Sequence, residues 1–236
     1  MTELIDVHAS FGAYPRAYVT GQSPEGLAAD MRRLGIAAAV VGSTASVWHD
    51  PANGNAEALT VAGMAGMHPC VTILPPTPEE SVDLKGATAA RMYPVTHDFD
   101  PLDPAMDPLY EQLVARGLPL TVGLPDIGWP TLDALAGRWP RLPVIVSAIG
   151  YRALRRLAAV FRRRPNLHAD LVNFASHEGL EWFVRHFGAE RLLFGTGTPV
   201  RDPAEAVARL MWSGLSDADR ALVGHGNARR LFRGLA

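Results

Sequence analysis

Residues 4–10, with the sequence LIDVHAS, have the pattern of a buried β-strand that becomes polar as it ends. The polar residues Asp6, His8 and Ser10 occupy alternate positions, and residues two apart in a strand point to the same face. We therefore expect these three side chains to line one wall. If the strand belongs to a parallel barrel, its C-terminal end is where catalytic groups are normally placed. This stretch alone is also compatible with a hydrogen-bonded core histidine at position 8.

The composition is that of an ordinary globular protein. The chain has 236 residues, of which 48% are hydrophobic, and a formal net charge of -2. This near-neutral charge provides no strong attraction to a polyanion, so neither nucleic acid nor a membrane surface is an expected partner. The single cysteine, Cys70, excludes a disulfide within the chain. With no recognisable signal peptide or membrane span, we expect a cytoplasmic protein.

Strand-like and helix-like segments alternate along the whole chain. After the first strand, seven further strand-like segments occupy residues 36–41, 69–74, 87–93, 118–124, 143–148, 166–172 and 191–196. Helix-start patterns lie between them, such as Ser23 before Pro24, and a short helix is expected to begin at residues 77–80. Eight such pairs predict an α/β fold, a minimal single-domain (β/α)₈ TIM barrel over residues 1–236 with a C-terminal helical tail.

Four motifs resemble one known family and occur in the expected order. Residues 5–10 resemble the strand-one Asp-x-His-x-His signature of the amidohydrolase superfamily. Residues 85–94, 191–199 and 226–232 resemble strand four, strand eight and the terminal motif of its amidohydrolase-related branch. That branch includes aminocarboxymuconate semialdehyde decarboxylase-like and dicarboxypyrone lactonase-like enzymes. The resemblance covers essentially the whole chain and implies a TIM barrel that acts on a small molecule, and a homodimer.

The family holds one divalent metal, usually zinc, through residues that this chain largely lacks. The resemblance places the second strand-one histidine at Ser10, the strand-five and strand-six histidines at Gly123 and Ala148, and the strand-eight aspartate at Gly197. Only His8 remains. Glycine and alanine carry no donor atom, and a serine hydroxyl is a poor zinc ligand. We therefore expect no metal at the inherited site and no other cofactor.

The polar residues left at the predicted barrel mouth form the candidate site. His8 is the expected acid/base, and Asp6 is the carboxylate expected to fix its tautomer. Arg91 and Tyr93 are the expected anchor for a substrate carboxylate, although Arg91 is equally compatible with a buried ion pair to Asp6. We expect further substrate contacts from Ser10, Tyr14, Trp48, His49, Asp126, Asn173, Thr196, Thr198 and Arg201.

Several local motifs have more than one interpretation. Residues 195–198, Gly-Thr-Gly-Thr, are compatible with a backbone anion cradle, but glycine that merely replaced a lost ligand is the simpler explanation. Ser147 lacks the Gly-x-Ser-x-Gly turn of serine hydrolases. His168 lies early in its strand, near the barrel bottom, and is interpreted as structural.

These observations favour an enzyme that works without a metal on a small carboxylated molecule, by hydrolysis, decarboxylation or a cyclisation-like step. The loss of four ligand positions leaves a second hypothesis, a non-catalytic barrel that binds a ligand or a partner chain. A third is a metal-dependent hydrolase whose ligands have moved to His8 and two of His49, His97 and His177.

Overall fold

In the computed structural model, which describes residues 2–15, 19–77 and 83–235, eight parallel strands form one sheet in the order β1 to β8. The predicted TIM barrel is therefore confirmed. The strands are β1 Leu4–Phe11, β2 Ile36–Ser43, β3 Met67–Thr72, β4 Ala89–Met92, β5 Leu120–Gly123, β6 Val144–Ser147, β7 Leu167–Asp170 and β8 Leu192–Leu193. Most of the segment expected to begin a short helix at residues 77–80 lies outside the described residues.

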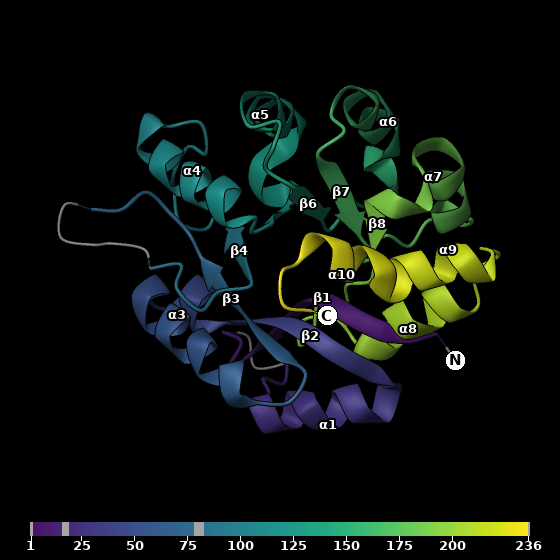
Figure 1. Cartoon of the computed structure of the whole chain (residues 1–236), viewed down its shortest axis with the longest axis horizontal. Helices are drawn as coiled ribbons and strands as arrows, with labels where there is room; N and C mark the ends of the chain where they lie inside the picture. The colour runs from purple at the N-terminus through teal and green to yellow at the C-terminus, as the bar shows by residue number, and fades with distance from the viewer. Residues whose placement is uncertain (1, 16–18, 78–82, 236) are drawn as a thin grey trace.

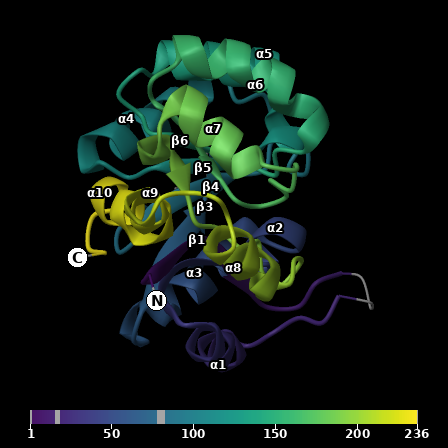
Figure 2. The same cartoon turned by 90° about the vertical axis from the view of Figure 1, so that its right-hand side faces the viewer.

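Most of the helices cover the outside of the barrel, and α10 lies over one of its ends (Figure 1). They are α1 Pro24–Leu34, α2 Ala45–Trp48, α3 Pro51–Thr60, α4 Asp107–Arg116, α5 Leu124–Arg138, α6 Leu154–Arg163, α7 Gly179–Phe187, α8 Pro203–Met211, α9 Asp217–Ala221 and α10 Asn227–Leu231. Short helical turns lie at η1 Val61–Gly63, η2 Pro104–Met106, η3 Tyr151–Ala153, η4 Ala189–Arg191 and η5 Leu222–Gly226. Turned by 90°, the molecule shows α4 to α7 on one side of the strands and α1, α3 and α8 on the other (Figure 2).

The helix-start patterns work as their chemistry predicts. The hydroxyl of Ser23 accepts a hydrogen bond from the N–H of Gly26 at 3.2 Å, and Pro24 fills the first helical position. Asp202 caps α8 in the same way by accepting from the N–H of Ala204 at 2.9 Å. Local sequence therefore fixes where these crossover helices begin.

Backbone hydrogen bonds between β1 and the segment that follows β8 bring the two ends of the sheet together. Val7 donates to the carbonyl of Phe194 at 2.9 Å, and Ser10 donates to the carbonyl of Thr198 at 2.9 Å. In the other direction, the N–H of Gly197 donates to the carbonyl of His8 at 2.8 Å. The loop after β8 is therefore held along the strand that carries His8.

The barrel interior is closed at one end and open at the other. Apolar side chains from six strands fill the interior and pack against Ala228, Phe232 and Leu235 of the C-terminal tail. This tail lies across the middle of the ring of strands in Figure 1. The opposite end, at the C-terminal ends of the strands, holds a cavity lined by both polar and apolar residues. Within residues 2–15, 19–77 and 83–235, no helix has both the length and the apolar character needed to cross a bilayer.

Candidate active site

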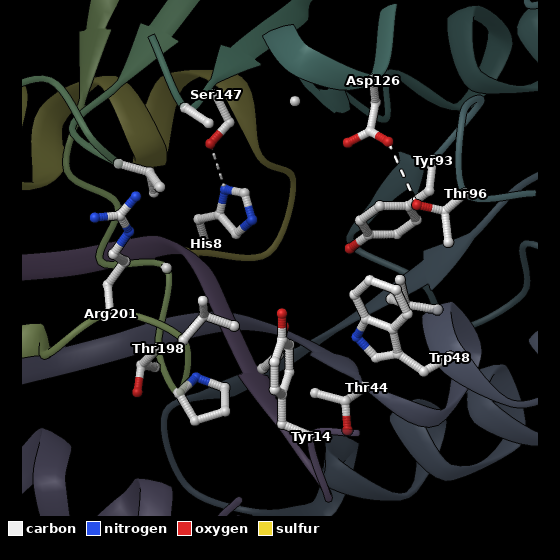
Figure 3. A pocket seen from close by; sticks show the side chains of 18 residues that line it. His8, Tyr14, Thr44, Trp48, Tyr93, Thr96, Asp126, Ser147, Thr198 and Arg201 are labelled. Atoms are coloured by element: carbon white, nitrogen blue, oxygen red, sulfur yellow. Dashed lines mark hydrogen bonds between the residues drawn. The ribbon is translucent and has the colours of Figure 1, made fainter. Parts of the chain in front are cut away.

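A cavity of about 280 Å³ lies at the C-terminal ends of the strands (Figure 3). Its wall includes residues of β1 and of the segments that follow β2 and β4 to β8. Apolar side chains, among them Val47, Trp48 and Val172, line it beside hydroxyl, carboxylate and guanidinium groups. Ligand pockets commonly have volumes of about 300–1,000 Å³. The cavity is therefore suited to a small molecule.

His8 is held on one edge of its ring by two residues from other strands. Its Nδ1 lies 2.8 Å from Oδ2 of Asp170, and the hydroxyl oxygen of Ser147 lies 2.9 Å from the same nitrogen. Because a carboxylate only accepts hydrogen bonds, these partners place the imidazole proton on Nδ1. Nε2 of the neutral ring is then an acceptor, and Figure 3 shows the second ring nitrogen turned toward the cavity.

Asp170 is fully buried and accepts three hydrogen bonds. Besides the His8 ring, it accepts from the hydroxyl of Ser147 at 2.9 Å and from the N–H of Val172 at 3.0 Å. The proton of Ser147 is thus given to Asp170 and not to Nε2 of His8. This is not the arrangement of a serine nucleophile, in which the histidine would accept that proton.

Sequence reasoning missed Asp170 entirely and treated Ser147 only as a residue without a nucleophile turn. Both are the last residues of their strands, β7 and β6. A signal was available, because polar His168 and Asp170 alternate in β7 much as Asp6 and His8 do in β1. Nothing in the sequence, however, says which of these residues meet across the barrel.

The prediction that Asp6 fixes the tautomer of His8 is wrong, since Asp170 makes that contact. The carboxylate of Asp6 instead accepts from the N–H of His8 at 2.9 Å and from the N–H and hydroxyl of Thr196 at 3.0 and 2.6 Å. A register shift between β1 and β2 from Asp6 to Ala9 interrupts the strand's alternation. His8 and Ser10 consequently line the cavity, whereas Asp6 does not. Burial raises the pKa of Asp6, and its hydrogen bonds oppose that rise.

Arg91 is buried and does not line the cavity, so the expected direct clamp on a substrate carboxylate is not formed. Its Nη1 donates to the carbonyl of Ala9 and to the hydroxyl of Ser10, each at 3.0 Å. Its Nη2 donates to the carbonyls of Val7 and Val40, at 3.4 and 3.0 Å. These partners are not carboxylates, so the alternative of an Asp6 ion pair is not formed either.

The other predicted substrate contacts divide into two groups. Those that line the cavity with His8 are Ser10, Tyr14, Trp48, Tyr93, Asp126, Thr198 and Arg201. His49, Asn173 and Thr196 are not part of its lining. His49 is exposed just after α2, the amide of Asn173 lies beside Gly150, and Thr196 is buried with its hydroxyl bonded to Asp6. Thr44 and Thr96 also line the cavity and were not predicted.

Two acidic groups face His8 from the opposite side of the cavity, on Tyr93 and Asp126 (Figure 3). Burial raises the pKa of Asp126, and a hydrogen bond from Thr96 opposes the rise only in part; the Thr96 hydroxyl lies 3.5 Å from the carboxylate. Burial also raises the pKa of Tyr93, against the nearby positive charge of Arg91. The cavity therefore brings together a held imidazole and a carboxyl group with increased affinity for a proton.

The four positions that the family resemblance assigns to missing metal ligands all line this cavity, as Ser10, Gly123, Ala148 and Gly197. The space beside two of them is occupied by other side chains. A Cβ on Gly123 would lie 3.0 Å from Oδ2 of Asp126. A Cβ on Gly197, where φ is +73°, would lie 3.0 Å from Cγ1 of Val172.

Two of the remaining alternatives lose support from the described geometry. In residues 195–198, the N–H groups of Thr196, Gly197 and Thr198 already donate to Asp6, to the His8 carbonyl and to the Thr196 hydroxyl, so they are not available as an anion cradle. No three histidine, cysteine, aspartate or glutamate side chains converge on a metal-sized site anywhere in the described ranges. His97, one of the proposed relocated ligands, bonds to the carbonyl of Val47 at 3.1 Å.

Comparison with known proteins extends the local motifs to nearly the whole chain. A family model described as amidohydrolase matches residues 5–234. Similar solved structures include an uncharacterised TIM-barrel protein from Bordetella bronchiseptica, with 20% identity, a TM-score of 0.74 and coverage of 97% of this chain and 98% of that one. No protein with a curated description matches the chain.

Two further similar structures have assigned names. The 5-carboxyvanillate decarboxylase from Sphingomonas paucimobilis is 17% identical, with a TM-score of 0.75 and coverage of 99% of both chains. A putative 2-pyrone-4,6-dicarboxylic acid hydrolase from Pseudomonas putida is 18% identical, with a TM-score of 0.74 and coverage of 97% of this chain and 96% of that one. At these identities the structural likeness establishes the shared barrel fold.

Proposed function

The chain belongs to the amidohydrolase family, and from that premise we propose that it is an enzyme that hydrolyses a small carboxylated molecule with His8 as its acid/base. One observation carries the proposal: Asp170 holds Nδ1 of His8 at 2.8 Å while the other ring nitrogen faces the cavity. An imidazole oriented by a carboxylate is a common arrangement for moving protons near neutral pH.

In this reaction Nε2 of His8 takes a proton from a water molecule as the water oxygen bonds to a carbonyl carbon of the substrate. The buried carboxylate of Asp170 stabilises the imidazolium that results. The same proton then passes from Nε2 to the leaving oxygen or nitrogen as its bond to the carbonyl carbon breaks. The imidazole returns to its neutral form, so no other oxidant, reductant or proton source is required.

Decarboxylation is a second candidate, because the cavity also contains Asp126 with its raised pKa. In that reaction the bond between a substrate carbon and its carboxylate breaks, and carbon dioxide leaves. The electron pair stays on the carbon and takes a proton from an acid in the cavity. A carboxyl group that remains protonated to higher pH is suited to supply it.

We propose that this member works without the family's metal, because its residues do not fit one. Of the five ligand positions implied by the family, only His8 and Ser10 retain a donor side chain. Restored ligands at positions 123 and 197 would meet Asp126 and Val172. A divalent cation that needs three or four firm donors is therefore poorly served.

The cavity favours a small carboxylated ligand. Among the described residues of the lining, Arg201 is the one arginine and there is no lysine, and the chemistry of a guanidinium suits a carboxylate on the ligand. The names of two similar structures include 5-carboxyvanillate and 2-pyrone-4,6-dicarboxylic acid, both single-ring carboxylates. We use these two compounds as test substrates for this chain.

The first experiment removes metal and tests turnover together. Chelator-treated protein, with its metal content measured by inductively coupled plasma mass spectrometry, is incubated with each compound, and products are followed by chromatography. We expect turnover without added metal, and a loss of about a thousandfold in His8→Asn, since acid–base groups contribute roughly 10²–10⁴ in rate. His186→Asn, on the outside of α7, is the matched control and should keep the wild-type rate.

Three results would contradict the proposal. Full activity of His8→Asn would remove the acid/base role. Activity that returns only with about one zinc or manganese ion per chain would favour the metal-dependent hydrolase with moved ligands. Saturable binding of either compound without turnover would favour the non-catalytic, ligand-binding barrel.

A further inference from the structure

The position of Arg91 requires an explanation that the proposed reaction does not supply. Its side chain is only 2% exposed, inside the barrel below the cavity. A buried charge is costly unless it is paired or well hydrogen-bonded. In the described part of the chain its guanidinium donates to three carbonyl groups of β1 and β2 and to the hydroxyl of Ser10, and a side-chain hydrogen bond also links it to Tyr93. The carbonyl contacts tie strands together, whereas the contact to Ser10 leads to the cavity.

The contact with Arg91 determines what the hydroxyl of Ser10 can do. Nη1 of Arg91 lies 3.0 Å from Oγ of Ser10, and a guanidinium only donates hydrogen bonds. Ser10 therefore accepts from the cation and keeps its own proton free to donate. Because Ser10 lines the cavity, a ligand there is within its reach. A hydroxyl that accepts from a cation in a low-dielectric interior is a stronger donor than an isolated one.

Tyr93 provides a second hydroxyl beside the same cation. It follows β4 two residues after Arg91, and its phenolic oxygen points into the cavity on the side that faces His8 (Figure 3). The positive charge of Arg91 partly opposes the effect of burial on the pKa of Tyr93. Nε of Arg91 is buried and has no hydrogen-bond partner among the residues that the structure describes, so the described barrel leaves one donor of the guanidinium unused.

We propose that Ser10 and Tyr93, with Arg91 behind them, bind the negatively charged oxygen of a ligand, either a carboxylate or the oxyanion formed when water adds to a carbonyl. This inference rests on the proposed function for the class of ligand. Ser10 and Tyr93 touch the ligand, and Arg91 is a positioning residue that acts through them. The buried guanidinium of Arg91 thus lies behind Ser10, a position that the family resemblance assigns to a metal ligand.

Binding at Ser10 and Tyr93 can be distinguished from the simple charge attraction that Arg201 exerts on an anion. Arg201 is exposed at the cavity rim, so its attraction for an anion is screened by salt. The donation from Ser10 is a short-range contact backed by a buried charge, and salt should affect it little. Binding that survives at high ionic strength therefore reports on Ser10 and Tyr93 more than on Arg201.

The test measures the binding of benzoate by NMR titration at about 0.5 M salt, with benzamide as the uncharged probe. A hydrogen bond to a charged group contributes roughly 1.5–3 kcal/mol, so Ser10→Ala should weaken benzoate binding by about tenfold or more. Benzamide binding should change by a smaller factor. Ser10→Thr, which keeps the hydroxyl, should restore most of the affinity for benzoate. Ser213→Ala, two residues after the end of α8, is the matched control and should bind as wild type does.

Arg91→Lys tests whether Arg91 acts through Ser10. In the Ser10→Ala background Arg91→Lys should weaken benzoate binding by a smaller factor than it does in the wild type, because only the path through Tyr93 remains. A purely structural Arg91 would have the same effect in both backgrounds. Thermal denaturation shows that each variant is folded. Unchanged benzoate affinity in Ser10→Ala, or no benzoate binding by the wild type, would overturn the inference. If His8→Asn loses turnover but Ser10→Ala binds benzoate normally, the proposed function is supported and the anion site at Ser10 and Tyr93 is rejected.

Discussion

Strand β7 serves two histidines in opposite ways at its two ends. At the mouth end, Asp170 holds Nδ1 of His8, whose ring borders the cavity. At the other end, His168 is buried, and its Nδ1 has no hydrogen-bond partner within the described residues. Burial, together with the positive charges of Arg230 and Arg191, lowers the pKa of His168 to about 3. At the mouth of the barrel the carboxylate of Asp170 lies beside the His8 ring, whereas at the bottom two arginines lie near the His168 ring.

The difference illustrates how the surroundings of an imidazole decide whether it is suited to act as a base. A carboxylate partner stabilises the protonated ring and fixes its tautomer, and an open side lets a substrate reach the second nitrogen. His168 has neither feature, and a ring whose protonation is disfavoured by burial and by two arginines cannot take up a proton near neutral pH. The interpretation of His168 as structural agrees with this position.

The largest expected effect, on turnover, comes from removing the carboxylate beside His8, so that the mouth, like the bottom, has no anion next to its histidine. Asp170→Asn removes the anion, and its amide can donate to Nδ1, which favours the tautomer with the proton on Nε2. We expect turnover of the carboxylated substrate to fall about a hundredfold, or roughly 3 kcal/mol of transition-state stabilisation. Steady-state kinetics with 2-pyrone-4,6-dicarboxylate or 5-carboxyvanillate measures it, and ¹⁵N NMR of the His8 ring reports the tautomer.

Asp133→Asn is the control for that prediction. Asp133 is a carboxylate of α5 that pairs with Arg163 and Arg164, outside the cavity lining. The substitution Asp133→Asn should leave both the turnover rate and the His8 tautomer unchanged. A wild-type rate in Asp170→Asn, with the His8 proton still on Nδ1, would mean that the contact across the barrel has no catalytic importance.

The strands and the location of the site follow from local sequence, but the partners within the site do not. Alternating apolar segments and helix caps such as Ser23 depend on neighbouring residues, so the barrel was predicted with its strands in order. His8 was found because it stands at a strand end. Asp170 and Ser147 lie 162 and 139 residues away from it, and only barrel closure brings them together. The register shift after Asp6 likewise depends on pairing with β2.

The next effect concerns stability at the bottom. The folded pKa of His168, about 3, is below the ordinary value of 6.5. Between these two values the unfolded chain binds the extra proton, so the contribution to stability is complete above pH 6.5 and is lost as the pH falls toward 3. From pH 7 to pH 5 the loss is about 2 kcal/mol. Urea unfolding of wild type and His168→Gln at both pH values measures it, since the variant should lose less stability over this interval.

Either of two results would contradict this account of His168. An equal loss of stability in wild type and His168→Gln would show that the ring is not kept neutral in the folded protein. A larger loss in the variant would have the wrong sign. His68→Gln is a useful second reference. His68, in β3, is only partly buried, and this partial burial also lowers its pKa.

The smallest expected effect is on the pKa of His168. Removing one nearby positive charge makes the surroundings of this ring slightly more like those of His8. Arg230→Gln should raise the pKa of His168 by about a few tenths of a pH unit, because the charge of Arg230 is the second cause of its depression and burial, the largest, remains. NMR of the His168 ring between pH 5 and pH 3 at low salt measures this shift. Arg229→Gln, which removes a neighbouring charge paired with Glu3, is the control and should move the titration less. Equal shifts in the two variants would mean that His168 senses only the total charge of the tail, and the contrast between the ends of β7 would then rest on burial and Asp170 alone.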